Sequence, residues 1–412
     1  MVDSKKSPKE RIEDFRKQGL SLDMTRGKPG TEQLELCNGM LTIVDENNYR
    51  TPSGLDVRNY GGLDGFPEAK QLFAEYLEVS LEEVIIGGNA SLNLMYDSVA
   101  QCVTHGTSGG GKPWFGQNTK FLCPVPGYDR HFTVCEHFGI RMIPVTLTES
   151  GPDMDEVEDR VRRDASIKGM WCVPKYSNPS GVVYSDDTVE RLASMNTAAP
   201  DFRILWDNAY TVHHLGAGPA ALKNVLETCK GAGNPDRVLI FGSTSKVSLP
   251  GAGLALAAGS RENMDWLRSR LRAQTIGPDK INMLRHVLYF KDMQGILNHM
   301  DKHARIIAPR FRAVQEILQR ELGDTGMAAW TQPKGGYFVS LDTKPGCAKA
   351  VISLAGELGV KFTQAGSTWP YGKDPRDSNI RIAPTLPSLE QIRSAVEVLA
   401  VCIQYVSSKG AA

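Results

Sequence analysis

The chain contains 412 residues, of which 41% are apolar and 23% are charged, a composition typical of soluble globular proteins. Lysine plus arginine and aspartate plus glutamate both total 47, so the formal net charge is zero, which argues against a nucleic-acid-binding protein. A chain of this length predicts one large and one smaller domain.

A series of short apolar segments rich in β-branched and aromatic residues begins near residue 84. Gly, Pro or charged residues bound each segment, and helix-type patterns such as 91–105 and 186–196 separate most of them. This alternation predicts a mainly parallel sheet of seven strands sandwiched by helices. The expected strands are 84–88, 120–125, 139–145, 168–174, 202–207, 237–242 and 253–259.

The pattern changes after residue 260. Residues 261–323 are almost continuously helical in pattern, and short strands are then expected to alternate with helices, which predicts a smaller α+β domain. The fold class is therefore α/β with a second, α+β domain. We expect an N-terminal arm and part of the small domain in 1–50, the large domain in 51–295, and the C-terminal small domain in 296–412.

The sequence GTSGGGKP at 106–113 resembles the phosphate-binding pattern G-x-x-x-x-G-K-[ST], except that Pro113 replaces the hydroxyl residue. A phosphate-binding loop follows a strand and opens a helix. Here the expected order is reversed, with the helix before the loop and the strand after it. We therefore expect a flexible surface loop.

The eight cysteines are scattered, with no C-x-x-C pair, which predicts reduced thiols and no disulfide. The pairs His213-His214 and His131/His137 have no matching cysteine or carboxylate spacing, so we expect no metal site. The charged N-terminus is unlike a signal peptide, and no apolar run is long enough to cross a bilayer. These features favour a cytoplasmic protein.

The segment VLIFGSTSKVSLPGAG at 238–253 carries the most informative lysine. A strand ends there in a turn of small residues that presents Lys246. Desolvation at such a place lowers the pKa of a lysine and frees its amine as a nucleophile, although most lysines are simply exposed. Hydroxyls at Ser243 and Ser245 could hold a phosphate beside it.

Two upstream strands end in polar groups that fit the same site. Asp207 ends one strand and is followed by Tyr210, and Asn178 lies in a turn after another strand. Side chains at the carboxyl ends of parallel strands face the crevice where such folds bind ligands. Together these residues suggest pyridoxal 5'-phosphate: Lys246 would form the imine, Asp207 would keep the pyridine nitrogen protonated, and Tyr210 and Asn178 would contact the ring's phenolic oxygen.

The whole motif set resembles the fold-type I, class I pyridoxal-phosphate aminotransferases, and within them a bacterial subgroup of aspartate aminotransferases. The resemblance covers nearly the whole chain. The motifs that carry it, in the family's order, are LDMTRGKPG, YGGLDGFPEAK, GGNASLNLMYD, CPVPGYDRH, YSNPSG, WDNAY, STSK, PKGGYF and NIRIAP.

The resemblance implies further cofactor contacts. Asn89 and Ala90 match the loop whose amides hold the phosphate, and Ser243 matches a phosphate-binding serine. Tyr128 matches the aromatic residue that stacks on the pyridine. Tyr60 matches the tyrosine that reaches the phosphate of the neighbouring subunit, which implies a homodimer with shared active sites. Many family members also have a phosphate-binding arginine where this chain has Gly251–Gly253 without one.

The resemblance also implies the substrate contacts. Arg381 matches the arginine that pairs with the substrate α-carboxylate, which suits its planar fork. Gly27 matches a glycine that lets the N-terminal segment approach the substrate. The resemblance also implies that Asn178 contacts the substrate. A second cation is needed for the distal carboxylate of a dicarboxylic substrate. Arg26, Lys28 and Arg58 are candidates.

We therefore expect an aminotransferase that uses L-aspartate and 2-oxoglutarate. One alternative is a transaminase for aromatic, kynurenine or 2-aminoadipate substrates. Another is a β-decarboxylase or lyase on the same fold. A transcription regulator with this domain as a ligand sensor is disfavoured, because the LDMTRGKPG motif begins within the first thirty residues and leaves no room for a DNA-binding domain.

Overall fold

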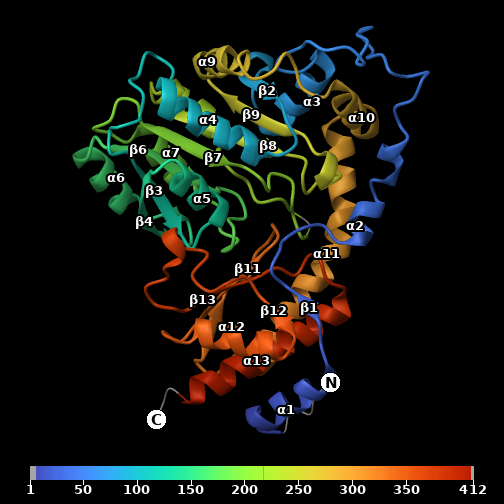
Figure 1. The fold of residues 1–412 in the computed structure, drawn as a ribbon, viewed down its shortest axis with the longest axis vertical. Coiled ribbons are helices and arrows are strands. Elements are labelled where there is room, and N and C mark those ends of the chain that lie inside the picture. The colour runs from blue at the N-terminus through green and yellow to red at the C-terminus, as the bar shows by residue number, and fades with distance from the viewer. Residues whose placement is uncertain (1–5, 217, 410–412) are drawn as a thin grey trace.

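A large twisted sheet forms the centre of the upper body in the computed structural model, which describes residues 6–216 and 218–409 (Figure 1). Its eight strands lie in the order β2-β9-β8-β7-β6-β3-β4-β5. The strand bounds are β2 (Val84–Ile86), β3 (Lys120–Val125), β4 (Arg141–Thr148), β5 (Gly151–Pro152), β6 (Ile167–Cys172), β7 (Arg203–Asp207), β8 (Val238–Ser243) and β9 (Ala255–Gly259).

The central strands β4, β3, β6, β7 and β8 are parallel to one another. Strand β9 is antiparallel to both β8 and β2, because a short connection after Ser243 turns the chain back directly. The mainly parallel sheet is confirmed. The predicted number of strands was one too low, because β5 has only two residues and pairs antiparallel with β4.

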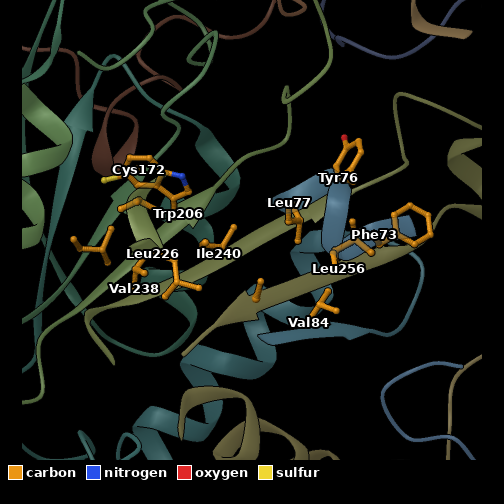
Figure 2. Close-up of a cluster of buried hydrophobic side chains, with 14 of the residues drawn as sticks. Phe73, Tyr76, Leu77, Val84, Cys172, Trp206, Leu226, Val238, Ile240 and Leu256 are labelled. Carbon is orange, nitrogen blue, oxygen red and sulfur yellow. The ribbon is translucent and has the colours of Figure 1, made fainter. Parts of the chain in front are cut away.

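Helices cover both faces of this sheet, because side chains alternate along each strand. Trp206 and Ile240 face one helical layer, and their neighbours Leu205 and Leu239 face the other. Figure 2 shows the first layer, where Phe73 and Leu77 of a helix lie near strand residues. The helices on that side are α3 (Pro67–Leu77), α6 (Met154–Arg163), α7 (Asp186–Ser194), α8 (Val225–Gly231) and α10 (Lys280–Phe290). The other side has α4 (Ser91–His105), α5 (Asp129–His137) and α9 (Arg261–Leu271).

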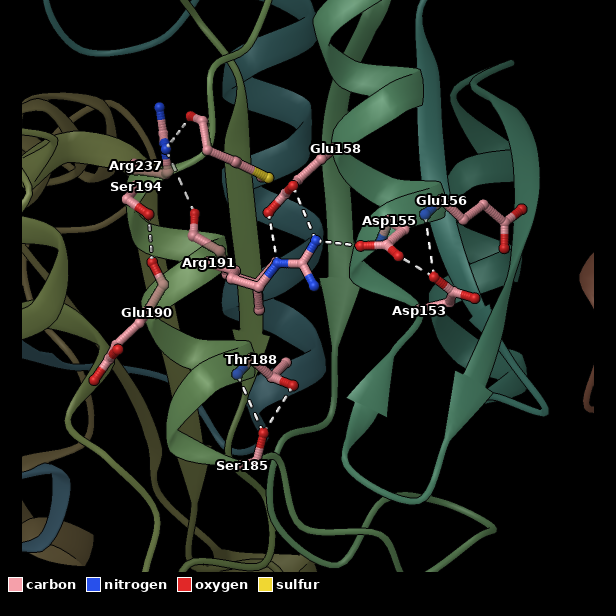
Figure 3. Close-up of polar contacts among 12 residues, drawn as sticks. Asp153, Asp155, Glu156, Glu158, Ser185, Thr188, Glu190, Arg191, Ser194 and Arg237 are labelled. Atoms are coloured by element: carbon pink, nitrogen blue, oxygen red, sulfur yellow. Dashed lines mark hydrogen bonds and ion pairs between the residues drawn. The ribbon is translucent and has the colours of Figure 1, made fainter.

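Polar contacts join neighbouring helices at the edge of this body (Figure 3). Arg191 of α7 donates from Nε to Glu158 of α6 at 2.8 Å and from Nη2 to Asp155 at 2.5 Å. These groups are largely exposed, so each pair adds little stability. These contacts join α6 to α7 and are not part of the site described below.

A second hydrophobic core lies in the lower body. It is built from three antiparallel strands, a two-stranded parallel pair and four helices, and both ends of the chain contribute. The strands are β10 (Ala328–Trp330), β11 (Val339–Thr343), β13 (Asn379–Ile382), β1 (Leu22–Asp23) and β12 (Val360–Lys361). The helices are α1 (Pro8–Gln18), α11 (Met293–Leu322), α12 (Ala348–Glu357) and α13 (Leu389–Lys409). A buried ion pair of 2.7 Å between Arg11 and Glu321 ties α1 to α11.

Helix α11 joins the two bodies. Ile296 and Met300 near its start pack in the first core, whereas Phe311 and Val314 pack in the second. Short helices α2 (Thr31–Glu35) and η1 (Asn38–Leu41) follow the N-terminal strand. No helix among residues 6–216 and 218–409 is long and apolar enough to cross a membrane.

The glycine-rich segment 106–113 lies between α4 and β3, in the order that the sequence indicates. The expectation of a flexible surface loop is wrong for its first half. Gly106, Thr107 and Ser108 are buried, and Ser108 accepts a hydrogen bond from Arg203 at 3.0 Å and donates one to Asn263 at 2.6 Å. Gly109 and Gly110 are exposed. The buried arginine therefore fixes one end of the segment.

Candidate active site

The turn after β8 presents Lys246 to a cavity. Backbone hydrogen bonds from Val247 and Ser248 to the carbonyl of Thr244, at 2.9 and 2.8 Å, close this turn. The Lys246 Nζ lies 4.9 Å from the centre of the Tyr210 ring. Burial lowers the pKa of the Lys246 amine; the Asp207 carboxylate opposes this effect, and Arg381 adds to it. A lower pKa increases the fraction of free amine, the nucleophilic form.

Asp207 ends β7 and is 3% exposed. Its Oδ2 lies 3.0 Å from Nε2 of His131, and the His131 ring stacks on Trp171 with centroids 4.2 Å apart. Its Oδ1 is buried and has no hydrogen-bond partner among the described residues. An unpartnered buried carboxylate oxygen is costly, so this atom indicates a donor that a ligand would bring.

Two tyrosines and an asparagine stand around the Lys246 amine. Burial raises the pKa of both Tyr210 and Tyr128, so both phenols stay protonated near neutral pH and can donate hydrogen bonds. Asn178 accepts a weak hydrogen bond of 3.4 Å from Arg381. The inner site therefore offers two hydrogen-bond donors, the phenols of Tyr128 and Tyr210, and a carboxyl acceptor, Asp207.

The inner cavity has a volume of about 190 Å³. Helix α4 begins at its edge, with Ala90 as N-cap, so the unpaired amides of its first turn lie beside the hydroxyls of Ser243 and Ser245. Such a helix N-terminus favours an anion. The lining residues are Ala90, Ser91, Leu92, Met95, Tyr128, Val173, Asn178, Asp207, Ala209, Tyr210, Ser243, Ser245 and Lys246.

An outer cavity of about 490 Å³ shares Tyr128, Asn178, Tyr210 and Lys246 with the inner one. Arg381 of β13 lies in its wall, 7% exposed, with its guanidinium 4.9 Å from the Phe338 ring. It forms an ion pair of 3.2 Å with Asp129, and its Nε is buried without a partner among the described residues. The guanidinium can therefore accommodate a further anion.

Gly27 lies in the same wall and touches Phe338. A Cβ at position 27 would come within 2.3 Å of that ring, so no other residue fits without movement. The flanking Arg26 and Lys28 are exposed and line the outer cavity, as does Arg130. Arg58 does not line it; two hydrogen bonds of 2.9 and 2.7 Å tie its guanidinium to Asp56.

The structure does not bring every candidate residue into these two cavities. Tyr60 is 80% exposed and lines neither. Asn89, directly before Ala90, instead lines a neighbouring cavity of about 860 Å³ together with Gly253 and Asn282. Asn89 therefore does not line the inner cavity, although it directly precedes Ala90, which does.

The sequence analysis missed His131, Ser91 and Asp129. His131 lies three residues after Tyr128, which places both on one side of α5, and this spacing was the available signal. Ser91 follows Ala90 directly. Asp129 could not be found, because its contact with Arg381 joins positions 252 residues apart.

The fold and these cavities are those expected of a fold-type I, pyridoxal-phosphate-dependent enzyme. A lysine, an aspartate at a strand end, a helix N-terminus with serines, and a buried arginine meet at the carboxyl edge of a mainly parallel sheet. Comparison with known proteins gives the family.

The chain belongs to the aspartate amino-transferase family, whose model matches residues 1–412. A relative from Mycolicibacterium smegmatis, assigned to the aminotransferases without a substrate, is 50% identical over 93% of this chain and 90% of its own. The aspartate aminotransferase of Corynebacterium glutamicum is 44% identical, over 96% and 91% of the two chains. The crystal structure of an aspartate transaminase from C. glutamicum superposes with a TM-score of 0.96 at 43% identity, covering 98% of this chain and 96% of that one.

Proposed function

We propose that this protein is an aspartate aminotransferase that binds pyridoxal 5'-phosphate and exchanges the amino group between L-aspartate and 2-oxoglutarate. The observation that carries the proposal is the inner cavity, which is lined by both Lys246 and Asp207, whose buried Oδ1 has no partner among the described residues. The similarity to the C. glutamicum aspartate aminotransferase supports the choice of substrate.

The residues of the inner cavity fit this cofactor. Oδ1 of Asp207 would accept a hydrogen bond from the protonated pyridine nitrogen, while His131 holds the other oxygen. The N-terminus of α4, with Ser243 and Ser245, would take the phosphate, and Tyr128 would cover one face of the ring. When bound, the cofactor supplies an electron sink that stabilises negative charge at the substrate Cα.

Lys246 has two roles in this proposal. Its amine would hold the cofactor covalently before substrate arrives, and Nζ would then be free to take the proton from the substrate Cα as a general base. The lowered pKa of Lys246 suits the second role, because a free amine is needed at working pH. The ring of Tyr210, 4.9 Å from Nζ, limits where the amine can move.

Arg381 would bind the substrate α-carboxylate through its planar fork, in place of the Asp129 contact. The distal carboxylate of aspartate needs a second cation at the mouth of the outer cavity. Arg26, Lys28 and Arg130 line this cavity, whereas Arg58 is tied to Asp56. We therefore propose that one of the first three supplies the charge.

We further propose a homodimer with shared sites, in which Tyr60 contacts the phosphate bound by the partner. Its 80% exposure leaves the phenol free to do so. The division into an N-terminal arm (1–50), a large domain (51–295) and a small domain (296–412) is supported by the two cores, the second of which includes Phe15 and Met24. Eight free cysteines support a cytoplasmic location.

A single-turnover experiment tests the substrate. The protein reconstituted with pyridoxal phosphate is mixed with L-aspartate, L-kynurenine, L-phenylalanine or L-2-aminoadipate, and the cofactor absorbance is followed. We expect the fastest change with L-aspartate and its reversal by 2-oxoglutarate. A faster change with one of the other donors would move the assignment to the corresponding transaminase. Release of carbon dioxide without reversal by 2-oxoglutarate would indicate a decarboxylase.

A further inference from the structure

Three buried side chains of types that bind metal ions meet beside the Lys246 turn, on the side that does not border the inner cavity. We call this the closed side of the turn. Cys37 lies just before η1, and His299 and His303 lie four residues apart on α11, so they project from one face of the helix. The Cys37 Sγ and one ring nitrogen of each histidine lie within 4.8 Å of one another. Exposures of 0%, 4% and 1% exclude bulk water from this cluster, which we call the Cys37 cluster.

The distances within the Cys37 cluster match those between ligands of a tetrahedral ion. With Zn–S near 2.3 Å and Zn–N near 2.05 Å, ligand atoms are separated by about 3.5 Å for S···N and about 3.3 Å for N···N. In the structure, Sγ of Cys37 lies 3.5 Å from Nε2 of His299, and the two Nε2 atoms lie 3.0 Å apart. These two separations differ from the expected ones by a few tenths of an ångström at most, and the third, between Sγ and the His303 nitrogen, is within 4.8 Å.

A fourth ligand atom is present. The carbonyl oxygen of Val247 lies 2.9 Å from Nε2 of His299 and 3.8 Å from Sγ of Cys37. Two imidazoles and a thiol thus lie close together, with the carbonyl beside His299 and Cys37, a donor set that suits a borderline-soft divalent ion such as Zn²⁺ or Co²⁺.

In this hydrogen-bond arrangement no proton is available for the contact between Nε2 of His299 and the Val247 carbonyl. The Gln33 amide donates to Nδ1 of His303 at 2.9 Å, so a neutral His303 carries its proton on Nε2, directed at Nε2 of His299. The His299 nitrogen that accepts this proton has none left for the carbonyl of Val247. Two lone pairs therefore face each other in a dry environment, and a cation at this point would satisfy both.

We propose that Cys37, His299, His303 and the Val247 carbonyl form a binding site for one zinc-type divalent ion, separate from the cofactor cavity. Binding would convert the Cys37 thiol to a thiolate and release its proton to solvent. His303 would then carry its proton on Nδ1. Turning over the Gln33 amide would let its oxygen accept this proton, at the cost of the 3.2 Å hydrogen bond that Gly30 N–H now donates to that oxygen.

The position of this site links it to Lys246 through the backbone. Val247 directly follows Lys246, whose own carbonyl contacts Tyr337 Oη at 3.4 Å and His213 Nε2 at 3.3 Å. An ion on the Val247 oxygen therefore binds the segment that presents the catalytic amine. Entry requires the short α2–η1 segment to lift from α11, so exchange is expected to be slow.

Cobalt titration of the full-length holoprotein tests the proposal. Co²⁺ bound by a thiolate in a tetrahedral site gives intense visible bands and a near-ultraviolet sulfur-to-metal band. We expect one equivalent of Co²⁺ to produce these bands, one equivalent of Zn²⁺ to abolish them, and one equivalent of zinc to remain after dialysis. These readouts do not depend on transamination, so they can fail while the proposed function stands.

Matched variants locate the ion. Cys37→Ser is expected to remove the sulfur-to-metal band, and His303→Gln to reduce the bound zinc at least tenfold; circular dichroism checks the fold of each. Cys347→Ser removes the least buried thiol and is expected to change nothing. The proposal is overturned if the wild type gives no tetrahedral spectrum, or if Cys347→Ser abolishes the bands while Cys37→Ser and His303→Gln keep them.

Discussion

The two sides of the Lys246 turn differ in how their buried polar groups are satisfied. On the open side, Asp207 and Lys246 border a cavity, and one oxygen of Asp207 has no partner among the described residues. On the closed side, Cys37, His299 and His303 contact one another with no cavity between them. Asp207 on the open side, at 3% exposed, is as buried as the Cys37 cluster, whereas Lys246 is only partly buried, so burial alone does not distinguish the two sides. The open side has room for an organic ligand, and the closed side at most for a single ion.

A third group supports the turn between these two sides. His286 of α10 lies with Nε2 2.8 Å from Ser248 Oγ and 3.1 Å from Thr244 Oγ1, and its Nδ1 contacts the Asn282 carbonyl at 2.8 Å. These hydrogen bonds, which His286 forms in its neutral state, therefore hold the turn in place. The following experiments test the residues of the open side, the arginine of the outer cavity and the histidine that supports the turn.

Replacing the amine on the open side is expected to have the largest effect. Lys246→Ala should lower kcat by about 10³-fold or more, because it removes both the covalent anchor and the general base. Lys175→Ala is the matched control: burial lowers the pKa of Lys175 too, but this residue lines neither active-site cavity. Steady-state assays with L-aspartate measure both variants. Equal losses in the two would contradict the assignment.

Replacing the acceptor on the open side is expected to be nearly as damaging. Asp207→Asn should lower kcat by about 10²–10³-fold, because a neutral amide stabilises a protonated pyridine poorly. Asp201→Asn removes another buried carboxylate, which pairs with Lys168 at 2.7 Å far from the cavities. It should lower the melting temperature and leave kcat within a fewfold of wild type. The comparison fails if Asp201→Asn lowers kcat as strongly as Asp207→Asn.

The substrate-binding arginine should act mainly on KM. Arg381→Lys keeps the charge and loses the fork that binds a carboxylate with two hydrogen bonds. A charged hydrogen bond contributes about 1.5–3 kcal/mol, so KM for L-aspartate should rise roughly ten- to hundredfold. Initial rates over a range of L-aspartate concentrations measure this. An unchanged KM would show that the α-carboxylate binds elsewhere.

Protonation of His286 should weaken the protein as pH falls. Burial lowers the pKa of His286 from 6.5 to about 4, so between these values the unfolded chain binds a proton that the folded chain does not. The stability that depends on neutral His286 is therefore present above about pH 6.5 and is lost as the pH falls toward 4. Melting temperatures of wild type and His286→Gln from pH 7.5 to 4.5 test this. The variant should show the shallower decline; parallel curves would contradict the prediction.

The smallest effect is expected at Asp129. This half-buried carboxylate competes with the substrate for Arg381, and such a pair contributes about 0.2–1 kcal/mol. Asp129→Asn should therefore lower KM for L-aspartate by at most about fivefold, with kcat unchanged. Titration with maleate, an unreactive dicarboxylate, gives an independent affinity. Weaker maleate binding in the variant would show that Asp129 supports the site.

Sequence reasoning was most successful where local pattern decides structure. The helix expected at 91–105 forms as α4 (Ser91–His105), and the ends of β7 and β8 bring Asp207 and the Lys246 turn to one edge, as parallel strands require. It failed where contacts join distant positions. In the Cys37 cluster, the four-residue spacing of His299 and His303 on α11 was a local signal that the sequence analysis did not use, whereas Cys37 lies 262 positions before His299 and could not be found from spacing.

Some local features were also beyond the sequence. The antiparallel β9 looks like any buried strand, because direction depends on the connection and not on the apolar pattern. The glycine-rich segment 106–113 looked mobile, since the buried Arg203 that holds Ser108 lies 95 residues away. The fold class and the placement of Asp207 and the Lys246 turn at one edge of the sheet were thus predictable, whereas the direction of β9 and the contacts of segment 106–113 were not.

Chemical trapping of the cofactor tests the central claim most directly. The holoprotein is reduced with borohydride, digested, and examined by mass spectrometry for the lysine that carries the phosphopyridoxyl group. We predict the label on Lys246 alone, and its loss when L-aspartate is added before reduction. Label on Lys175, on Lys280 or on no lysine after reconstitution would contradict the account of the open side of the turn.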